Sequence, residues 1–350
     1  MAVISKHRSF IMGIASLWIY YYHVFPIRLI EYFRVPTQAE IYFRNLGFCG
    51  VDIFLVLSGF GLYHALSRKF PENLHEYGEY ALRRFGRIYP VFVPVTLFIA
   101  LVDHWSLGEL LGKVSGLTQL FDNVYVYLWY IPCIMLFYLL IPFYFRAYRR
   151  CKNTLVLTVA SVVGVIFVSY LLYGYVREDL YAIINRIPVF LVGIYMGELC
   201  LRNHVLKWKD YMIAFVVLIV GVYISFHHSQ YRVPEVYPCF GAALNLFIAP
   251  PLVVLLGSAC EWLSSHIARH LKPICGGVYK VFALLGSVSL EFYVVQEWIC
   301  LKTRNSSTLL ALAGHNEWGQ QAVCLVLTVI ATALVHVFSE FLKGCCRRKK

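Results

Sequence analysis

The chain has 350 residues, of which 60% are hydrophobic, 17% are aromatic and 14% are charged, and its formal net charge is +12. Soluble globular domains carry about 25% charged residues and lack the apolar runs of about 20 residues that recur along this chain. The composition therefore excludes a soluble protein and predicts an all-α, polytopic integral membrane protein. Its basic stretches are short and flank apolar segments, so we expect them to set membrane topology and not to bind nucleic acid.

Apolar runs separated by charged or Pro- and Gly-rich breaks predict about ten transmembrane helices. The first is expected to be retained because no small-residue cleavage pattern follows it, and the sixth is short for a full crossing. In chain order, the predicted helices cover residues 9–25, 46–66, 88–104, 124–145, 154–174, 187–200, 211–226, 239–262, 281–300 and 318–341. With a cytoplasmic N-terminus, most of the 31 Lys and Arg residues fall on the inner side, so both chain ends are predicted to be cytoplasmic.

Two polar side chains are predicted to lie at similar depth in the first two helices. His23 is near the outer end of the first, and Asp52 is about 10 Å into the outer half of the second at 1.5 Å per residue. An aspartate within a span costs about 2.5–3.5 kcal/mol, so it needs a partner. Consecutive helices are usually neighbours, and we therefore expect Asp52 to orient the imidazole of His23 for general-base catalysis. In the alternative interpretation, Asp52 bonds within the bundle and His23 belongs to an interfacial aromatic belt.

Small residues follow Asp52 on the same predicted helix. Ser58 and Gly59 are of the kind that lets two helix backbones approach closely in lipid. Close helix packing is therefore expected at this point of the second helix.

Three arginines, Arg83, Arg84 and Arg87, lie directly before the third predicted helix on the inner side. Guanidinium groups bind phosphate through two parallel hydrogen bonds, so this cluster is a candidate site for a polyanionic ligand from the cytoplasm. Positive-inside topology or anionic lipid headgroups would also explain it.

The remaining candidates line a predicted cavity or lack an assigned role. The chain has 11 cysteines without the spacing of a metal site, so no metal is expected. His64 and His336 are predicted to be interfacial and receive no role. The candidate cavity residues are Trp129, Tyr130, Arg186, Glu291 and Glu297.

Several segments together resemble the acyltransferase family 3 membrane proteins. The stretch "CGVDIFLVLSGF" is similar to the Gly-Val-Asp and Ser-Gly-Phe signature of that family. The position of His23 also matches, as does the order of four further segments. These are "LRRFGRIYP", "LWYIPCIMLFYLLIP", "RIPVFLVGIYMGEL" and "LGSVSLEFYVV".

The resemblance implies a single ten-helix acyltransferase domain over residues 1–350, without an appended soluble domain, in a bacterial inner or plasma membrane. Such an enzyme moves an acyl group, commonly acetyl, from cytoplasmic acyl-CoA to a hydroxyl of an extracytoplasmic acceptor such as a cell-surface polysaccharide or exopolysaccharide sugar. Besides acyl-CoA and this carbohydrate, its partners are membrane lipids. The resemblance implies that His23 is catalytic with Asp52 as its neighbour and that the arginines contact the donor, and we assign Ser58 to donor binding as well.

Two departures from the family pattern and one other class of function stay open. Family members often carry an arginine where this chain has Met12, and many carry a histidine where it has Gln296.

Either general-base catalysis or a covalent acyl intermediate on His23 fits the same residues. The alternative function is a secondary transporter or an exporter of a lipid-linked sugar or small anion. The arginine cluster and the lack of a visible half-to-half repeat argue against that alternative.

Overall fold

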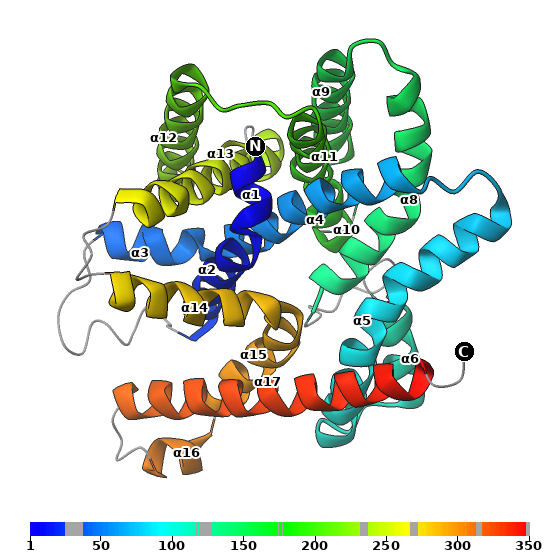
Figure 1. Cartoon of the computed structure of the whole chain (residues 1–350). Helices are drawn as coiled ribbons and strands as arrows, with labels where there is room; N and C mark the ends of the chain where they lie inside the picture. The colour runs from blue at the N-terminus through cyan, green and yellow to red at the C-terminus, as the bar shows by residue number, and fades with distance from the viewer. Residues whose placement is uncertain are drawn as a thin grey trace. The chain divides into compact units, whose positions relative to one another are not determined.

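The structure is a computed structural model of the whole chain, and it describes residues 1–24, 38–116, 118, 128–173, 175–176, 178–231, 237–266, 272–304, 306–312 and 317–347. These residues form helices and short connections and contain no strand, which confirms the expected all-α membrane fold. The helices, labelled in Figure 1, are α1 (Ala2–Lys6), α2 (Arg8–Val24), α3 (Gln38–Asn45), η2 (Leu46–Phe48), α4 (Cys49–Arg68), α5 (Leu74–Val102), α6 (Leu107–Ser115), α8 (Tyr130–Arg150), α9 (Thr154–Leu172), α10 (Glu178–Ile184), α11 (Ile187–Leu201), α12 (Trp208–Tyr231), α13 (Tyr237–His266), α14 (Lys272–Ser287), α15 (Ser289–Arg304), α16 (Ser307–Leu312) and α17 (Glu317–Arg347).

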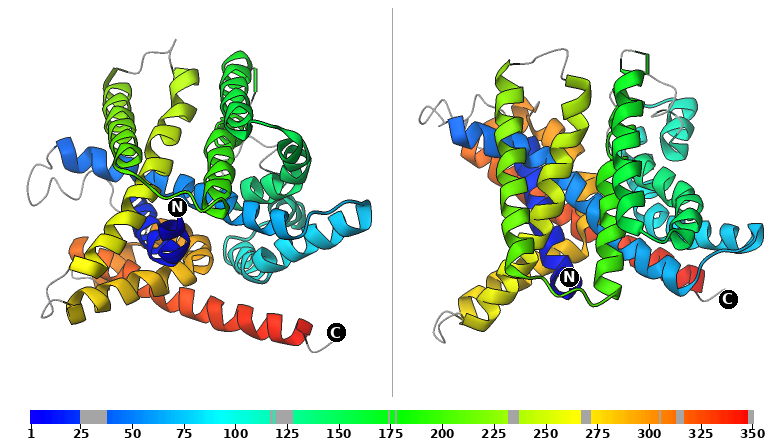
Figure 2. Two further views of the ribbon diagram at one scale, coloured as in Figure 1. Left: turned by 45° about the horizontal axis from the view of Figure 1, so that its top comes forward. Right: turned by 90° about the horizontal axis from the view of Figure 1, so that it is seen from above.

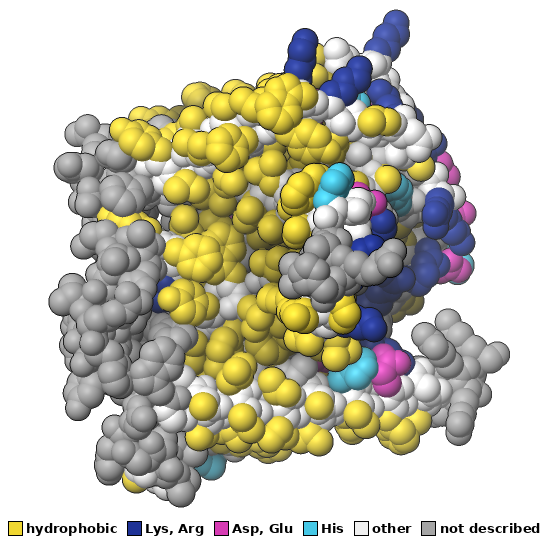
Figure 3. Space-filling view, turned by 60° about the vertical axis from the view of Figure 1, so that its left-hand side comes forward, with side chains coloured by type: hydrophobic (Ala, Val, Ile, Leu, Met, Phe, Trp, Pro, Cys, Tyr) yellow, Lys and Arg dark blue, Asp and Glu magenta, His cyan; other side chains and the backbone are white. Residues whose placement is uncertain are grey.

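The length and composition of these helices suit a bilayer. Among the described residues, eight helices are long and apolar enough to cross a membrane, or nine if α14 and α15 are taken together as one interrupted span. Hydrophobic side chains predominate on the described part of the face drawn in Figure 3. Helices that expose apolar side chains on several faces, as α9 and α12 do, are expected to contact lipid.

Some predicted boundaries differ from the observed ones. The predicted helix 281–300 is wrong as one continuous helix, because a turn at Val288 separates α14 from α15. Glycine and serine around this point are poor helix formers. The apolar pattern continues through the turn, so the pattern did not indicate it. The third predicted helix begins earlier, at Leu74, and the short sixth is lengthened by α10 into a candidate span over Leu180–Leu201. Residues 124–127 of the fourth lie outside the described residues.

The described chain divides into two compact units, each assembled from separate segments. Unit 1 comprises Met1–Ala15, Cys49–Gly78 and Leu136–Gly286. Unit 2 comprises Ser16–Phe48, Glu79–Met135 and Ser287–Lys350. That the whole chain acts as one acyltransferase domain stays a prediction.

Unit 1 is built on a tight, parallel pair of helices, α4 and α11. A Cβ atom added to Gly59 would overlap the carbonyl oxygen of Phe190, and one on Gly193 would overlap that of Val56. One turn further on, a Cβ on Gly197 would lie 2.7 Å from the carbonyl oxygen of Phe60. Glycine therefore lets the two backbones touch, as predicted around Ser58 and Gly59.

The other long helices of unit 1 pack around this pair. In both views of Figure 2, α12 runs beside α13, and α9 lies next to α11. Every residue of α4 from Cys49 to Leu57 is buried, although the helix is apolar enough to face lipid. The central position of α4 explains why a carboxylate on it requires a protein partner.

Unit 2 contains α15 packed against α17. The thiols of Cys300 and Cys324 are buried and their sulfur atoms lie 3.6 Å apart. The Gln320 amide donates a hydrogen bond to the Thr303 carbonyl at 2.6 Å. These contacts hold the C-terminal end of α15 against α17.

Candidate functional site

Asp52 is held by an ion pair inside unit 1. Its side chain is fully buried, and its Oδ1 atom lies 3.7 Å from Nε of Arg186, whose side chain is 13% exposed. Asp52 comes from the first turn of α4, and Arg186 immediately precedes α11, which has Pro188 in its first turn. Removing one member of such a buried pair leaves the other charge uncompensated and is strongly destabilising. The sequence placed both residues in the outer half of the membrane but did not suggest that they pair.

Further polar groups lie on the elements that carry this pair. One turn before Asp52, the Cys49 thiol donates a hydrogen bond to Oδ1 of Asn245 on α13 at 3.1 Å. Asn245 is 1% exposed. An asparagine in an otherwise apolar predicted helix was the signal that could have identified it. Within the described part of the chain, neither carboxylate oxygen of Asp52 has a hydrogen-bond partner, so both can accept from a further donor.

His23 lies in the last turn of α2, in unit 2. Its Nδ1 atom is buried and has no hydrogen-bond partner among the described residues, which leave out 25–37. The ring packs edge-on against Tyr22, with ring centroids 5.1 Å apart. Because Asp52 belongs to unit 1, the expected contact between His23 and Asp52 stays a prediction.

Three of the candidate cavity residues come together in unit 2, where α8 begins. Trp129 and Tyr130 follow Leu128, whose N–H points at the Oε2 atom of Glu297 at 3.5 Å. The Tyr130 ring meets that of Tyr293 edge-on at 5.3 Å. The structure thus groups an aromatic pair with a buried carboxylate, the combination that binds sugars and other polar molecules with apolar faces.

Glu291, the deepest predicted carboxylate, has a partner in unit 2. Its Oε1 atom lies 3.1 Å from Nδ1 of His336 on α17. The sequence analysis assigned His336 no role because it appeared interfacial. Arg186, the remaining cavity candidate, belongs to unit 1, as does half-buried Ser58.

The predicted donor arginines lie on α5 within unit 2, and two of them contact their own helix. Arg83 pairs with Glu79 at 3.0 Å, and the guanidinium of Arg84 lies over the Tyr80 ring at 5.4 Å. The Arg87 side chain is exposed. Their role in donor binding stays a prediction.

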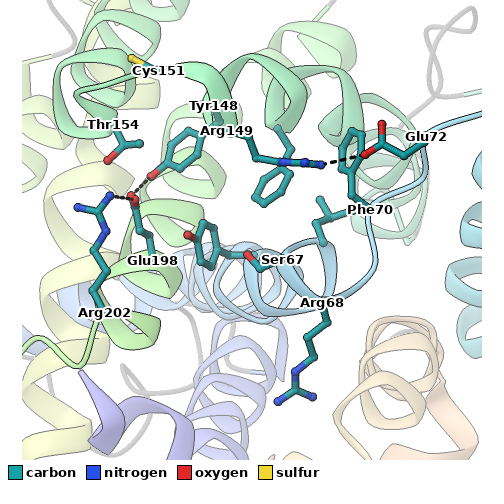
Figure 4. Close-up of a pocket in the computed structure, with 13 residues that line it drawn as sticks. Ser67, Arg68, Phe70, Glu72, Tyr148, Arg149, Cys151, Thr154, Glu198 and Arg202 are labelled. Carbon is teal, nitrogen blue, oxygen red and sulfur yellow. Dashed lines mark hydrogen bonds and ion pairs between the residues drawn. The ribbon is translucent and has the colours of Figure 1, made fainter.

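A cavity of about 520 Å³ that the sequence did not suggest lies in unit 1. Figure 4 shows the side chains around it, which come from the ends of α4, α8 and α11, the start of α9 and the segment after α4. Its charged lining residues are Arg68, Glu72, Arg149, Glu198 and Arg202. The sequence signal was present in basic residues at three predicted inner helix ends, but positive-inside topology already accounted for them.

No group of three or more His, Cys, Asp or Glu side chains suited to a metal ion occurs within the described ranges.

Comparison with known proteins identifies one family. The model of the acyltransferase 3 family, described as an acyltransferase domain, matches residues 11–337. This range covers most of both units and includes every candidate residue named above. The comparisons with curated proteins and with solved structures find no significant match.

Proposed function

Since the chain belongs to the acyltransferase 3 family, we propose that this membrane acyltransferase moves an acetyl group from cytoplasmic acetyl-CoA to a hydroxyl of an extracytoplasmic acceptor. The acceptor we propose is a sugar of a cell-surface or exopolysaccharide, and the location is a bacterial inner or plasma membrane. The family match over residues 11–337 is the observation that carries this proposal. It favours an enzyme over the transporter or exporter considered from the sequence.

In the proposed step, His23 removes the proton from the acceptor hydroxyl. The oxygen attacks the thioester carbonyl, an oxygen–carbon bond forms, and the carbon–sulfur bond breaks. The proton taken up by His23 passes to the leaving thiolate, so that free CoA is released. The buried Nδ1 of His23, which has no partner in the described ranges, supports a role in proton transfer. In the alternative chemistry, the same imidazole first accepts the acyl group and then transfers it to the hydroxyl.

Asp52 is proposed to act with His23 as a carboxylate that stabilises the imidazolium. A charged carboxylate inside a protein core requires a compensating cation. Arg186 supplies that cation at 3.7 Å and leaves both oxygens able to accept a hydrogen bond. Arg186 is therefore proposed as the residue that positions Asp52.

The two substrates are assigned to different residues. Arg83, Arg84 and Arg87, with Ser58, are the proposed contacts of the CoA donor. Trp129, Tyr130 and the carboxylates Glu291 and Glu297 are proposed to contact the acceptor, because rings stack on sugar faces while carboxylates accept from sugar hydroxyls. No metal takes part in the proposed reaction.

Transfer across vesicle membranes tests this proposal. Inside-out vesicles from producing cells are given acetyl-CoA labelled in the acetyl group, and label is measured in the lumenal carbohydrate fraction. We expect the label to disappear in His23→Ala and to fall steeply in Asp52→Asn, at equal amounts of protein. The control is His266→Ala, because His266 is exposed and its Nδ1 bonds to the Trp262 carbonyl of its own helix. Equal labelling in His23→Ala and the control would contradict the proposed role of His23, and absence of labelling from acetyl-CoA with folded protein would contradict the proposed donor.

A further inference from the structure

The cavity of unit 1 is assembled entirely from residues of that unit. Ser67 and Arg68 end α4, Tyr148 and Arg149 end α8, Thr154 begins α9, and Glu198 and Arg202 end α11. Its volume of about 520 Å³ lies within the range of about 300–1,000 Å³ typical of small-molecule sites. The cavity is thus large enough for a nucleotide.

One wall of the cavity presents a stacked guanidinium group. The Arg149 guanidinium lies 4.7 Å from the centroid of the Phe70 ring, and the Arg146 guanidinium is 5.7 Å from the same ring. This contact with the ring orients the Arg149 guanidinium at the cavity wall. A purine base stacks on such a guanidinium plane, and the N–H groups at its edge donate to phosphate oxygens.

Besides its contact with the Phe70 ring, Arg149 forms a weak ion pair. Its Nη1 atom lies 3.3 Å from Oε1 of Glu72, and the two side chains are 49% and 64% exposed. Exposed pairs of this kind contribute about 0–1 kcal/mol. A phosphate can therefore replace the carboxylate, and Glu72 acts as a competitor for Arg149.

The opposite wall is fixed by a buried carboxylate. Glu198 is 3% exposed, accepts a hydrogen bond from the Tyr148 hydroxyl, and pairs with Arg202 at 2.6 Å (Figure 4). The Arg202 side chain is 65% exposed and lines the cavity, so it is accessible to a ligand there. The wall is preorganised, because a buried, fully bonded carboxylate holds both Tyr148 and Arg202 in place.

The cavity also lies at the end of unit 1 that carries the chain's N-terminus. The Met1 amino group donates a hydrogen bond to the His204 carbonyl at 2.9 Å, directly after α11. The distribution of Lys and Arg predicts that this end is cytoplasmic. Acyl-CoA is present on that side.

We infer that this cavity binds the phosphorylated adenosine end of the acyl-CoA donor. The base stacks on the guanidinium of Arg149, and the N–H groups of Arg149 and Arg202 donate hydrogen bonds to the phosphates. The inference rests on the proposed donor and adds a site in unit 1 that neither the sequence motifs nor the family match assigns.

A binding measurement with the nucleotide fragment tests the inference without requiring catalysis. The full chain is placed in nanodiscs of phosphatidylcholine, and the dissociation constant of radiolabelled adenosine 3′,5′-bisphosphate is measured. Arg149→Ala is expected to raise Kd about tenfold, the effect of one lost charge-assisted hydrogen bond. Glu72→Gln is expected to lower Kd several-fold, because it removes the competing carboxylate. The matched control is Arg150→Ala, since Arg150 is exposed and adjacent but does not line the cavity.

The opposite shifts of Kd in Arg149→Ala and Glu72→Gln would support the inference, because a merely structural role predicts no gain in affinity from Glu72→Gln. Equal Kd values in Arg149→Ala and Arg150→Ala would overturn it, as would a loss of binding found in Arg84→Ala alone. An anionic lipid site is a further outcome that would overturn it. In that case the nucleotide does not bind, whereas labelled phosphatidylglycerol is retained by the wild type and lost from Arg149→Ala.

Acetyl transfer by the same variants separates this inference from the proposed function. Arg149→Ala is expected to raise the KM for acetyl-CoA and to leave kcat nearly unchanged, because the residue binds a part of the donor remote from the reacting carbonyl. Nucleotide binding with the predicted shifts but no acetyl transfer would refute the proposed function and keep the site. Acetyl transfer with an unchanged KM would refute the site and keep the function.

Discussion

Arg186→Met should destabilise unit 1, because it leaves the buried carboxylate of Asp52 without its compensating cation. Methionine keeps the length of the side chain and removes its charge. The Asp52 side chain is fully buried, and the paired atoms are 3.7 Å apart. At an effective dielectric constant of about 20, two unit charges at this distance attract each other by about 4.5 kcal/mol. Measured losses on removing one partner of a buried pair are about 3–5 kcal/mol.

The free energy of unfolding in mixed detergent micelles measures this loss. We expect a decrease of about 3–5 kcal/mol for Arg186→Met, and partial recovery when Asp52→Asn is added, because the double variant has no uncompensated charge. The coupling energy from the double-mutant cycle should be about 1–3 kcal/mol. Lys343→Met is the control, since Lys343 forms an exposed pair with Glu340 at 2.8 Å, and pairs of this type contribute about 0–1 kcal/mol.

A coupling energy near zero would refute the reasoning. The two residues would then contribute independently, and Asp52 would have a different compensating partner. A loss for Arg186→Met no larger than that for Lys343→Met would lead to the same conclusion.

Two further predictions concern helix packing and helix capping. Gly193→Val should lower the free energy of unfolding by more than about 2 kcal/mol, because a Cβ there overlaps the Val56 carbonyl. The control, Gly164→Val, should change it little, since a Cβ at Gly164 meets no neighbouring helix within 4 Å. Glu109 accepts a hydrogen bond from the Ser106 backbone N–H at 2.7 Å, and this bond lowers the pKa of Glu109. A carboxyl group whose pKa is lowered in the folded state stabilises the fold at pH values above its ordinary pKa. This stabilisation is lost as the pH falls through the folded-state pKa. The protection of the α6 amides against exchange, relative to their intrinsic rate at each pH, should therefore fall at acidic pH, and Glu109→Gln should remove this pH dependence of the protection. A larger loss of the free energy of unfolding in Gly164→Val than in Gly193→Val would contradict the first expectation. The same pH dependence of protection with and without Glu109 would contradict the second.

The helices could be predicted from the sequence because hydropathy is a local property. A run such as that around Asp52 must form a helix in lipid, where each backbone group needs a partner within its own segment. The turn at Val288 was missed for the same reason, since the apolar pattern continues through it. Helix existence is thus encoded locally, while interruption of a helix depends on packing.

The partner of Asp52 was harder to predict, because Arg186 is distant in sequence. The rule that consecutive helices are neighbours favoured His23 as the partner of Asp52. It did not point to Arg186, which precedes the fourth predicted helix after the one that carries Asp52. The parallel contact between α4 and α11 brings Arg186 to Asp52. The arginines of the unit 1 cavity, such as Arg149, had a sufficient explanation in topology, so nothing in the sequence singled them out.

Because of the glycine contacts between them, α4 and α11 form a rigid helix pair that runs through unit 1. Asp52 and Arg68 are separated by about 24 Å along α4 at 1.5 Å per residue. Sliding one helix past the other would drive side chains into backbone, because the carbonyl groups of Val56 and Phe60 already touch the surfaces of Gly193 and Gly197. The ion pair at one end and the cavity at the other are therefore kept at a constant separation. The α4–α11 pair therefore provides a fixed reference within unit 1.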